Sequence, residues 1–572
     1  MPNSLAQDAP RIRSPRPSVK GPSRGRPARG RVAVWTRGVI GALVLFCACE
    51  LLTRLEFVST EFLPYASRIA VRVPGLLAEG DFLAHLAATL QAWAIATVIA
   101  VAIAVPAGIA LGSSPVAYRI TRLVIELLRP IPSVTLIPLL ILLVGPALEM
   151  KVVVAVFAAL WPILFNAVYA IHDVDPVAKD TARSYGLSRL GVLRRVALPS
   201  AGPLVAAGVR VAAGIALTVV ISAELLTTAR PGPRHLHQAR GLRHRRGRHH
   251  VRRRGGRGRA RLRDQRDLPD GRAAVVLLVL ARGAVGVMAA SQQITGRFRV
   301  PGRRARLARG ARAVVERVGL LLVLLVLWQL ATEAGGSMHF PPPLTIFDRV
   351  RELWLSGPAD HAFVTGRALD DVVPSVARML GAWVLGSAIG VVTGVGIGLS
   401  PRVREYLEPS LHFVRSLPAP ALVPVFLLVL GVGSSARVAL AAFGVVWIVM
   451  INTSQAVASV DALMLETARA YQLPFRRRIL QVVLPGASPP IFAAMRIGLS
   501  LTLILMVLSE MIAGVGGIGF QLVQAQNSFA LVDVWATMVL LGVLGIVLNS
   551  AFSAAEHRML AWHRGSRSSD KR

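Results

Sequence analysis

Two short segments of the chain repeat the same polar and small residues at the same spacing. Residues 179–203 read KDTARSYGLSRLGVLRRVALPSAGP, and residues 465–489 read LETARAYQLPFRRRILQVVLPGASP. In each, an acid precedes Thr-Ala, and a Leu-Pro pair ends nineteen residues after the acid. An acid suits the first turn of a helix, and small residues let another surface approach closely. The pattern predicts helix, sharp turn and helix, with Pro199 and Pro485 setting the start of the next helix.

Two acids lie late in apolar segments, at Glu224 and Glu510. An ionisable residue within a membrane is by default a functional candidate that faces the bundle interior or a water-filled cavity. The equally weighted alternative is that both are structural acids near the outer interface. Arg210 and Arg496 lie fourteen residues earlier in the same segments, and we expect them to anchor the cytoplasmic ends.

The segments that position these residues are long and apolar. Hydrophobic residues make up 54% of the 572 residues, and the mean hydropathy is +0.57, which indicates a membrane protein. Most of the runs are near the roughly 20 residues that span a bilayer core. They are 34–52, 86–112, 120–145, 150–171, 200–226, 315–332, 376–399, 421–450 (a merged region), 490–514 and 531–552.

The chain contains an internal repeat with an offset of 286 residues. RPIPSVTLIPLLILLVG (129–145) aligns without a gap with RSLPAPALVPVFLLVLG (415–431). The same offset pairs Gly112 with Gly398, Trp161 with Trp447, Asn166 with Asn452, Arg210 with Arg496 and Glu224 with Glu510. The prediction is an all-α, polytopic transmembrane helical bundle made of two tandem homologous halves of five to six helices each. We expect the two asparagines to hydrogen-bond between helices.

Loop charge predicts the orientation of both halves. The segments 172–199 and 458–485 are rich in Arg and Lys, so both are expected to be cytoplasmic, together with the N-terminus. The segments 53–85 and 333–372 follow the first helix of each half and are expected on the opposite side.

The paired loops resemble the EAA motif of ABC importer permeases, the coupling helix that docks into a groove on the ATP-hydrolysing subunit. The matching positions are Asp180, Thr181, Ala182 and Gly186, then Glu466, Thr467, Ala468 and Gln472, with Pro199 and Pro485 closing the loops. The chain departs from the motif with Asp for Glu, Thr for the first Ala, and Gln472 for Gly. Because Gln resists the positive φ that Gly permits, we expect the second copy to dock differently in detail.

This resemblance extends over about 34–230 and 313–565 and is greatest to the nitrate, sulfonate and taurine branch. It implies a multi-pass permease of the cell inner membrane that is not itself an enzyme and carries no cofactor or metal. The implied partners are two ATP-binding subunits, an extracytoplasmic solute-binding protein and the bilayer, with no nucleic acid. No G-x-x-x-x-G-K-[ST] motif occurs in the sequence, so ATP hydrolysis is assigned to the separate subunits.

Other functions remain open at this point. A single basic loop with a terminal Pro is usually a solvated connector, and it is the two matching copies that favour coupling. An ion-coupled secondary transporter could use Glu224 and Glu510. A membrane enzyme is disfavoured because HExxH, GxSxG and closely spaced carboxylate pairs do not occur in the apolar segments.

The stretch 230–312 interrupts the repeat. It contains RHRRGRHHVRRRGGRGRARLR (243–263), whereas the repeat requires a counterpart of the apolar MVLLGVLGIVLNSAF (538–552). Arg at the bilayer centre is costly, and the block 243–263 lacks the Lys and the aromatic residues that would favour binding to nucleic acid. We interpret it as a frame error in a G+C-rich gene that removes the last helix of the first half. The alternative is a genuine basic cytoplasmic linker in a true fusion of two copies. The predicted divisions are a basic cytoplasmic tail (1–33), the first half (34–229), the anomalous segment (230–312), the second half (313–565) and a polar tail (566–572).

Overall fold

The computed structural model describes residues 28–56, 60, 64–228, 303–336, 339–359 and 363–561, and within these ranges the regular structure is helical without a strand. Eight helices among them are long and apolar enough to cross a membrane, or up to ten if each of two bent pairs is one span. The sequence-based prediction of an all-α polytopic bundle is confirmed. Most of the tail 1–33, most of the segment 230–312 and all of the tail 566–572 lie outside the described residues.

The helices follow one another in the same order in both halves. The first half contains α1 (Ala28–Arg54), α2 (Ala66–Ala78), α3 (Gly80–Ser113), α4 (Pro115–Leu128), α5 (Leu136–Val144), α6 (Leu148–His172), α7 (Pro176–Ser184), α8 (Arg189–Val192) and α9 (Leu198–Thr228). The second contains α12 (Arg303–Gly335), α13 (Pro343–Trp354), α14 (Val373–Leu399), α15 (Pro401–Ser416), α16 (Val423–Leu430), α17 (Ser434–Ala458), α18 (Ala462–Ala470), α19 (Phe475–Arg478), α20 (Leu484–Ala513), α21 (Ile518–Asn527) and α22 (Leu531–Met559). Two of the helices start inside predicted non-membrane segments, since α1 begins at Ala28 and α12 at Arg303.

Two of the predicted apolar runs are broken rather than continuous. The run 120–145 is divided between α4 and α5, whose axes differ by 67°, and the equivalent α15 and α16 differ by 76°. Prolines at the breaks lack a backbone N–H and cannot continue the helix. The merged run 421–450 is divided as well, because Gly431 (φ +77°) ends α16 before α17 begins.

A three-helix core recurs in each half: α3, α6 and α9 in the first, and α14, α17 and α20 in the second. Small residues every four positions let these helices approach closely. On α3 these are Ala92, Ala96, Ala100, Ala104 and Gly108, all buried. On α14, a Cβ placed on Gly390 would lie 2.8 Å from Cβ of Val449 on α17.

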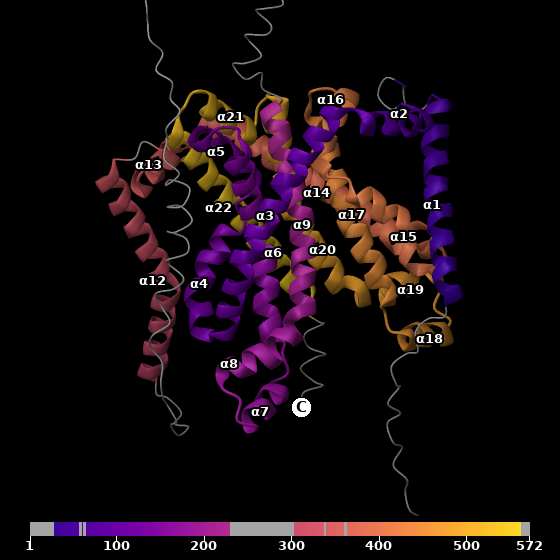
Figure 1. The fold of residues 1–572 in the computed structure, drawn as a ribbon, viewed down its shortest axis with the longest axis horizontal. Coiled ribbons are helices and arrows are strands. Elements are labelled where there is room, and N and C mark those ends of the chain that lie inside the picture. Colours follow the sequence, from indigo (N-terminus) through magenta and orange to yellow (C-terminus); the bar gives the residue numbers. More distant parts are fainter. Residues whose placement is uncertain are drawn as a thin grey trace, which may run out of the picture.

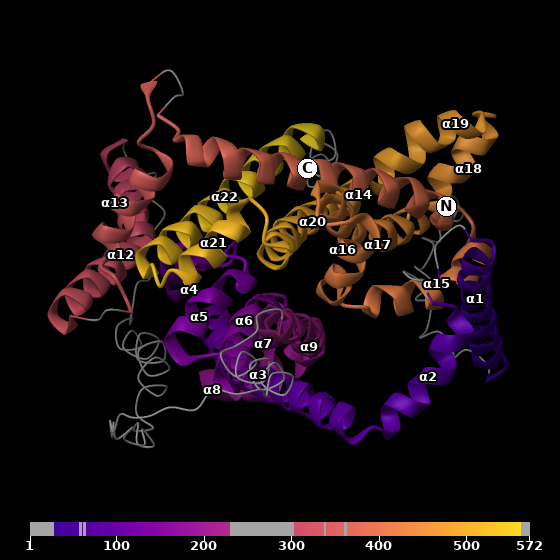
Figure 2. The ribbon, with the colours of Figure 1, turned by 90° about the horizontal axis from the view of Figure 1, so that it is seen from above.

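The two halves exchange contacts at their peripheries. Helix α1 of the first half packs against α15 of the second, and α12 of the second packs against α4 of the first (Figures 1 and 2). Helices α21 and α22 of the second half also contact α5 of the first. The hydrophobic core therefore continues across the boundary between the halves.

The two ends of the bundle differ in what they present. Figure 1 shows α7 and α8 at the same end as α18 and α19, with α2, α13, α16 and α21 at the other. The segments predicted to lie on opposite sides of the membrane are thus at opposite ends of the molecule. Which end faces the cytoplasm stays a prediction.

Candidate coupling surface

Each candidate loop begins with the same helix cap. The side chain of Asp175 accepts a hydrogen bond from the backbone N–H of Val177 (2.8 Å), and Asp461 accepts one from Leu463 (2.9 Å). Such caps satisfy amide groups that the first turn leaves without intrahelical partners. The caps lie 286 residues apart, so α7 and α18 start at equivalent positions. The prediction that the motif acid lies in the first turn is wrong, because Asp180 and Glu466 are the fifth residues of these helices.

The turns after α7 and α18 have the same backbone hydrogen bonds. Gly186 N–H donates to Arg183 O (2.9 Å), and Gln472 N–H donates to Arg469 O (2.9 Å). Both residues have positive φ, +78° for Gly186 and +49° for Gln472. Gln472 therefore adopts the conformation it was expected to resist, and the backbone hydrogen bonds of the two turns are the same.

Burial divides the motif residues in the same way in both loops. The acid and the threonine are exposed, whereas Ala182 and Ala468 are buried against the bundle. Asp180 pairs with Arg183 on its own helix (2.9 Å), and both side chains are largely exposed. An exposed pair of this kind contributes little to stability, so the acid is free to exchange partners.

Apolar side chains project from the same surface, and the motif comparison missed them. Tyr185 is 84% exposed and its counterpart Tyr471 is 79% exposed. Val177 and its counterpart Leu463 are also exposed, at 70% and 68%. Tyrosines are enriched in protein interfaces because they offer large contact area and one polar group. The signal in the sequence was the matching Tyr one residue before the turn position in each copy.

Pro199 and Pro485 lie at the second position of α9 and α20, but the prediction that they set the start of a helix is wrong, because no loop precedes α9 and α20. A π-helical turn, η2 (Leu193–Ala197) or η6 (Ile479–Val483), joins the short helix to the long one at the same register in both copies. In the first half this gives one helical run over Arg189–Thr228. The short helices α8 and α19 are thus extensions of the long helices, which links a surface loop directly to the core.

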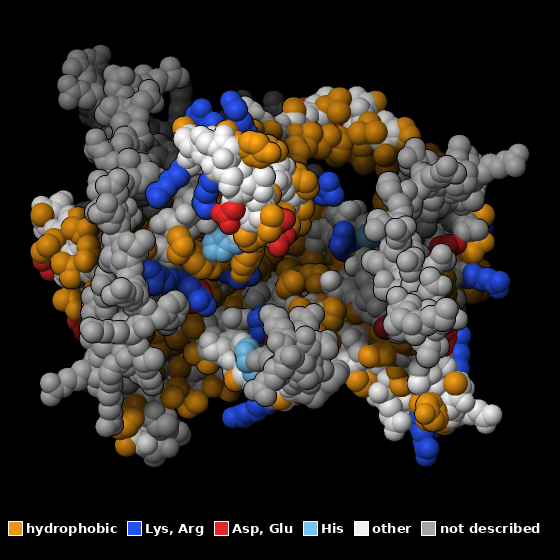
Figure 3. Space-filling model, turned by 90° about the horizontal axis from the view of Figure 1, so that it is seen from below, with side chains coloured by type: hydrophobic (Ala, Val, Ile, Leu, Met, Phe, Trp, Pro, Cys, Tyr) orange, Lys and Arg blue, Asp and Glu red, His pale blue; other side chains and the backbone are white. Residues whose placement is uncertain are grey.

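Positive charge surrounds the loops at this end. Figure 3 looks onto this face and shows Lys and Arg side chains at several places among the described residues. Lys179 lies at the base of the first loop, where its ammonium group donates to Ile171 O at the end of α6 (2.9 Å). Such charge favours an acidic partner surface and anionic lipid headgroups.

The acid Glu510 is at the other end of the molecule. It is fully buried, and its carboxylate accepts hydrogen bonds from Ser375 Oγ (2.6 Å), Arg378 Nη2 (3.1 Å) and the N–H of Gly519 (3.0 Å). A Cβ on Gly517 (φ +112°) would lie 2.4 Å from this carboxyl group, so the loop between α20 and α21 closes around it. Glu510 therefore fixes this loop to α14.

The counterpart Glu224 shares the hydroxyl contact of Glu510 but pairs with a different cation, and it is more open. It accepts hydrogen bonds from Thr89 Oγ1 (3.0 and 3.1 Å) and Lys151 Nζ (2.9 Å), which are the counterparts of Ser375 and Arg437. The side chains of Lys151 and Glu224 are 20% and 25% exposed. Arg437 instead donates to the carbonyl oxygens of the loop after α20.

The remaining predicted polar residues differ from expectation in part. Asn166 and Asn452 donate to Pro162 O and Ile448 O of their own helices (2.8 Å each), so the predicted hydrogen bonds between helices are wrong for these amides. Arg496 binds Ser553 and Glu556 of α22, whereas Arg210 is exposed.

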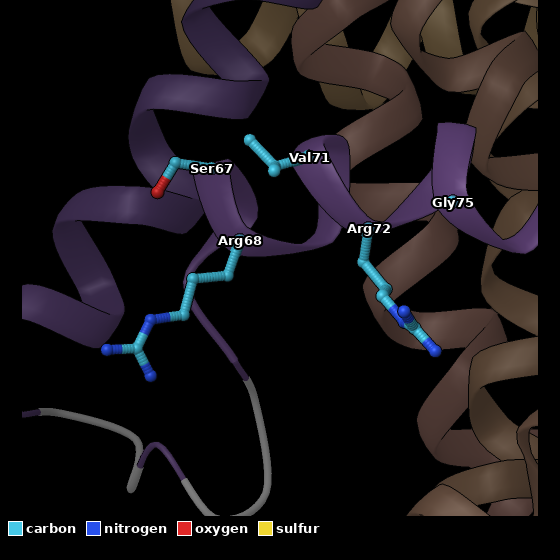
Figure 4. A pocket seen from close by; sticks show the side chains of 5 residues that line it. All are labelled: Ser67, Arg68, Val71, Arg72 and Gly75. Atoms are coloured by element: carbon cyan, nitrogen blue, oxygen red, sulfur yellow. The ribbon is translucent and has the colours of Figure 1, made fainter.

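A shallow hollow lies on α2, lined by Ser67, Arg68, Val71, Arg72 and Gly75. Figure 4 shows the two arginine side chains pointing away from this helix. All of its lining comes from one surface helix, so it has no converging groups. Within the described residues, no group of three or more His, Cys, Asp or Glu could hold a metal ion.

The fold and the loops define a polytopic membrane protein in which one helical unit occurs twice, each copy presenting a loop at the same end. Residues 104–234 and 386–560 match the family described as the binding-protein-dependent transport system inner membrane component. These two segments cover more than half of the chain, and the chain belongs to this family of multi-pass membrane proteins. The first match stops shortly after α9, whereas the second continues through the whole of α22.

Individual relatives align with less than half of the chain. A putative aliphatic sulfonates transport permease of Bacillus subtilis is 29% identical over 248 residues, which are 43% of this chain and 87% of that protein. The taurine transport system permease of Escherichia coli is 28% identical over 44% of this chain and 91% of its own length. A nitrate import permease of Synechocystis is 25% identical over 41% and 86%. One relative thus corresponds to one half, which confirms the two tandem copies.

Proposed function

We propose that this chain supplies both membrane halves of an ABC importer and that the loops α7–α8 and α18–α19 each dock one separate ATP-hydrolysing subunit. The observation that carries this proposal is the equivalence of the loops. They have the same cap, the same turn hydrogen bonds and the same exposed tyrosine. A loop that only connects two helices requires neither the same exposed residues nor the same turn in both copies. Two matching exposed loops at one end of the molecule favour two matching partners.

The π turns give the coupling a mechanical route. Force applied to α7 and α8 passes through η2 into α9, which is part of the three-helix core, and η6 links α19 to α20 in the same way. Closure of the two ATPase subunits would move the loops together, rock the halves and switch the pathway from one side to the other. A solute-binding protein would deliver solute at the end that carries α2, α13 and α21.

The relatives suggest the solute class. Their names refer to aliphatic sulfonates, taurine, nitrate and bicarbonate, all of which carry an oxyanion group. We assign a small oxyanion of this type to the present chain. Glu224 and Glu510 were candidate pathway residues, and their contacts favour the structural alternative, in which they hold the outer ends of α9 and α20. An anionic solute would also be repelled by a free carboxylate.

The test uses two charge reversals in the loops, Asp180→Lys with Glu466→Lys. The full chain is reconstituted in vesicles with its ATPase subunits and binding protein, and solute uptake and ATPase stimulation are measured. We expect both to fall at least tenfold while the protein remains in the membrane. Asp348→Lys with Asp370→Lys is the matched control for ATPase stimulation measured without the binding protein, because both acids are exposed and lie away from the loops. Uptake is not compared for this control, since Asp348 lies on α13, at the end assigned to the binding protein. Unchanged uptake in the loop variant would refute the proposal.

A further inference from the structure

The second half has an apolar surface whose counterpart in the first half is covered. This surface, called the α16 face, comprises Leu417, Ala421, Pro424, Val425 and Leu428, in and before α16. Val425 is 44% exposed and Leu428 is 61% exposed. The counterpart of Val425 in the first half, Leu139, is only 3% exposed.

Helices α21 and α22 of the second half cover the equivalent surface of the first. Two glycines of α22 make this close contact possible. A Cβ on Gly545 would lie 3.0 Å from Pro130 O, and a Cβ on Gly542 would lie 3.2 Å from Cγ1 of Ile131. The glycine face of α22 therefore lies over the break between α4 and α5.

Lipid alone is a poor cover for the α16 face. The chain between α15 and α16 bends by 76° and includes non-helical residues at the break. Within a membrane, non-helical backbone is tolerated only where protein buries it or where it lines a water-filled cavity. The non-helical backbone between α4 and α5 is covered by α22 of the second half. The backbone between α15 and α16 requires a cover of the same kind.

The described residues of the first half, which end at Thr228, include no element that would provide this cover. Its family match ends at residue 234, soon after α9, and the stretch beyond is rich in Arg where an apolar span is required. The two equivalent arginines, Arg210 and Arg496, also indicate that the first half has no described counterpart of α22. Arg496 binds Ser553 and Glu556 on α22, whereas its counterpart Arg210 is exposed.

We propose that the α16 face is the docking site for a helix pair of the α21–α22 type, supplied by the first copy when its reading frame is restored. The pair would place small residues over Ser416 and Leu417, the counterparts of Pro130 and Ile131. Each half would then cover the broken helix of the other. This concerns assembly and stands whether or not the loops bind ATPase subunits.

The test grafts the missing pair into the full chain. Residues 230–275 are replaced by a second copy of 516–561, in a background with Cys47→Ser and Cys49→Ser. Pro130→Cys with Gly545→Cys is the reference pair, since the two Cβ positions are 3.1 Å apart. The test pair is Ser416→Cys with a Cys at the counterpart of Gly545 in the graft. We expect both pairs to form intrachain disulfides under mild oxidation.

Three results would contradict the proposal. In the first, the reference disulfide forms in the grafted chain and the test disulfide does not. The α16 face would then be covered by lipid. In the second, the reference disulfide forms in the ungrafted chain but not in the grafted chain. The added helices would then disturb the existing contact between α22 and the first half. The third is an interchain disulfide between Ser416→Cys and Gly545→Cys in the ungrafted chain, which would assign the face to a second copy.

A spin label at Leu428 gives a measurement that needs no disulfide. In the ungrafted chain we expect it to collide freely with oxygen dissolved in the bilayer, while a label at the counterpart Leu142 does so less. The graft should lower the oxygen accessibility at Leu428 severalfold and leave that at Leu142 unchanged. Equal accessibility at Leu428 with and without the graft would contradict the proposal.

Discussion

At the scale of single residues, Gln472 shows how a substitution in a repeated motif can be tolerated without a change of shape. Its φ of +49° lies in the left-handed region, where Gly186 of the first copy lies at +78°. A side chain in this region costs about 1 kcal/mol, because its Cβ crowds the following carbonyl. The sequence therefore predicted where the turn is, but the loop contacts around it outweigh the preference of Gln.

Gln472→Gly should accordingly stabilise the protein by about 1 kcal/mol without changing the loop. Equilibrium unfolding in mixed micelles would measure the gain in the free energy of unfolding. Gly186→Gln is the matched control and should cost about the same amount. Equal stability of all three proteins would mean that the turn carries no strain.

The two equivalent arginines provide a second comparison. Arg496 binds Ser553 and Glu556, whereas Arg210 is exposed, so Arg496→Ala should lower the free energy of unfolding by about 1–3 kcal/mol. Arg210→Ala should change it by less than about 0.5 kcal/mol. The same unfolding measurement applies, and similar losses for both variants would show that the contacts with α22 contribute no stability.

At the scale of helices, the sequence predicted the positions of the apolar segments well. It predicted less well how these segments bend or break. The helices α3, α6 and α9 match predicted runs because a long apolar segment has few alternatives in a bilayer. The broken pairs, the π turns and the closed loop around Glu510 depend on tertiary contacts. Prolines mark the positions of the breaks, but they do not predict the angle between the two helices of a pair. The π turns have no such local marker, and Ser375, which binds Glu510, lies 135 residues away.

Removal of the charge of Glu510 tests the loop between α20 and α21. Glu510→Gln leaves the guanidinium of Arg378 without its buried partner, which typically costs roughly 3–5 kcal/mol. Glu224→Gln should cost about 1 kcal/mol or less, because its pair with Lys151 is partly exposed. Unfolding measurements on both would decide, and an unchanged stability of Glu510→Gln would point away from a structural role.

The glycine face of α22 is a further element that can be tested alone. Gly545→Leu would force side-chain atoms against Pro130, and overpacking of this kind costs about 1–3 kcal/mol. Gly396→Leu on α14 is the control, since open space surrounds its Cβ position. Thermal unfolding of the purified chains should show a lower midpoint for the first variant only, and equal midpoints would contradict close packing at Gly545.

At the scale of the whole molecule, the repeat in the sequence was enough to predict two halves, and the way in which they interlock was not. The contacts of α1 with α15 and of α12 with α4 join helices from different halves, and lipid-facing apolar helices carry no signal for a particular neighbour. The paired loops were predicted because polar residues at fixed spacing are rare in so apolar a chain. The exposed Tyr185 and Tyr471 became evident only when burial was known.

The central claim is that one chain carries two equivalent docking sites for ATPase subunits, and their number can be counted. Native mass spectrometry of the full chain with its ABC ATPase subunit should show two ATPase subunits per chain. Tyr185→Ala with Asp180→Lys should reduce this to one, as should Tyr471→Ala with Glu466→Lys, and the four changes together should abolish binding. Two ATPase subunits still bound to the fourfold variant would contradict the account.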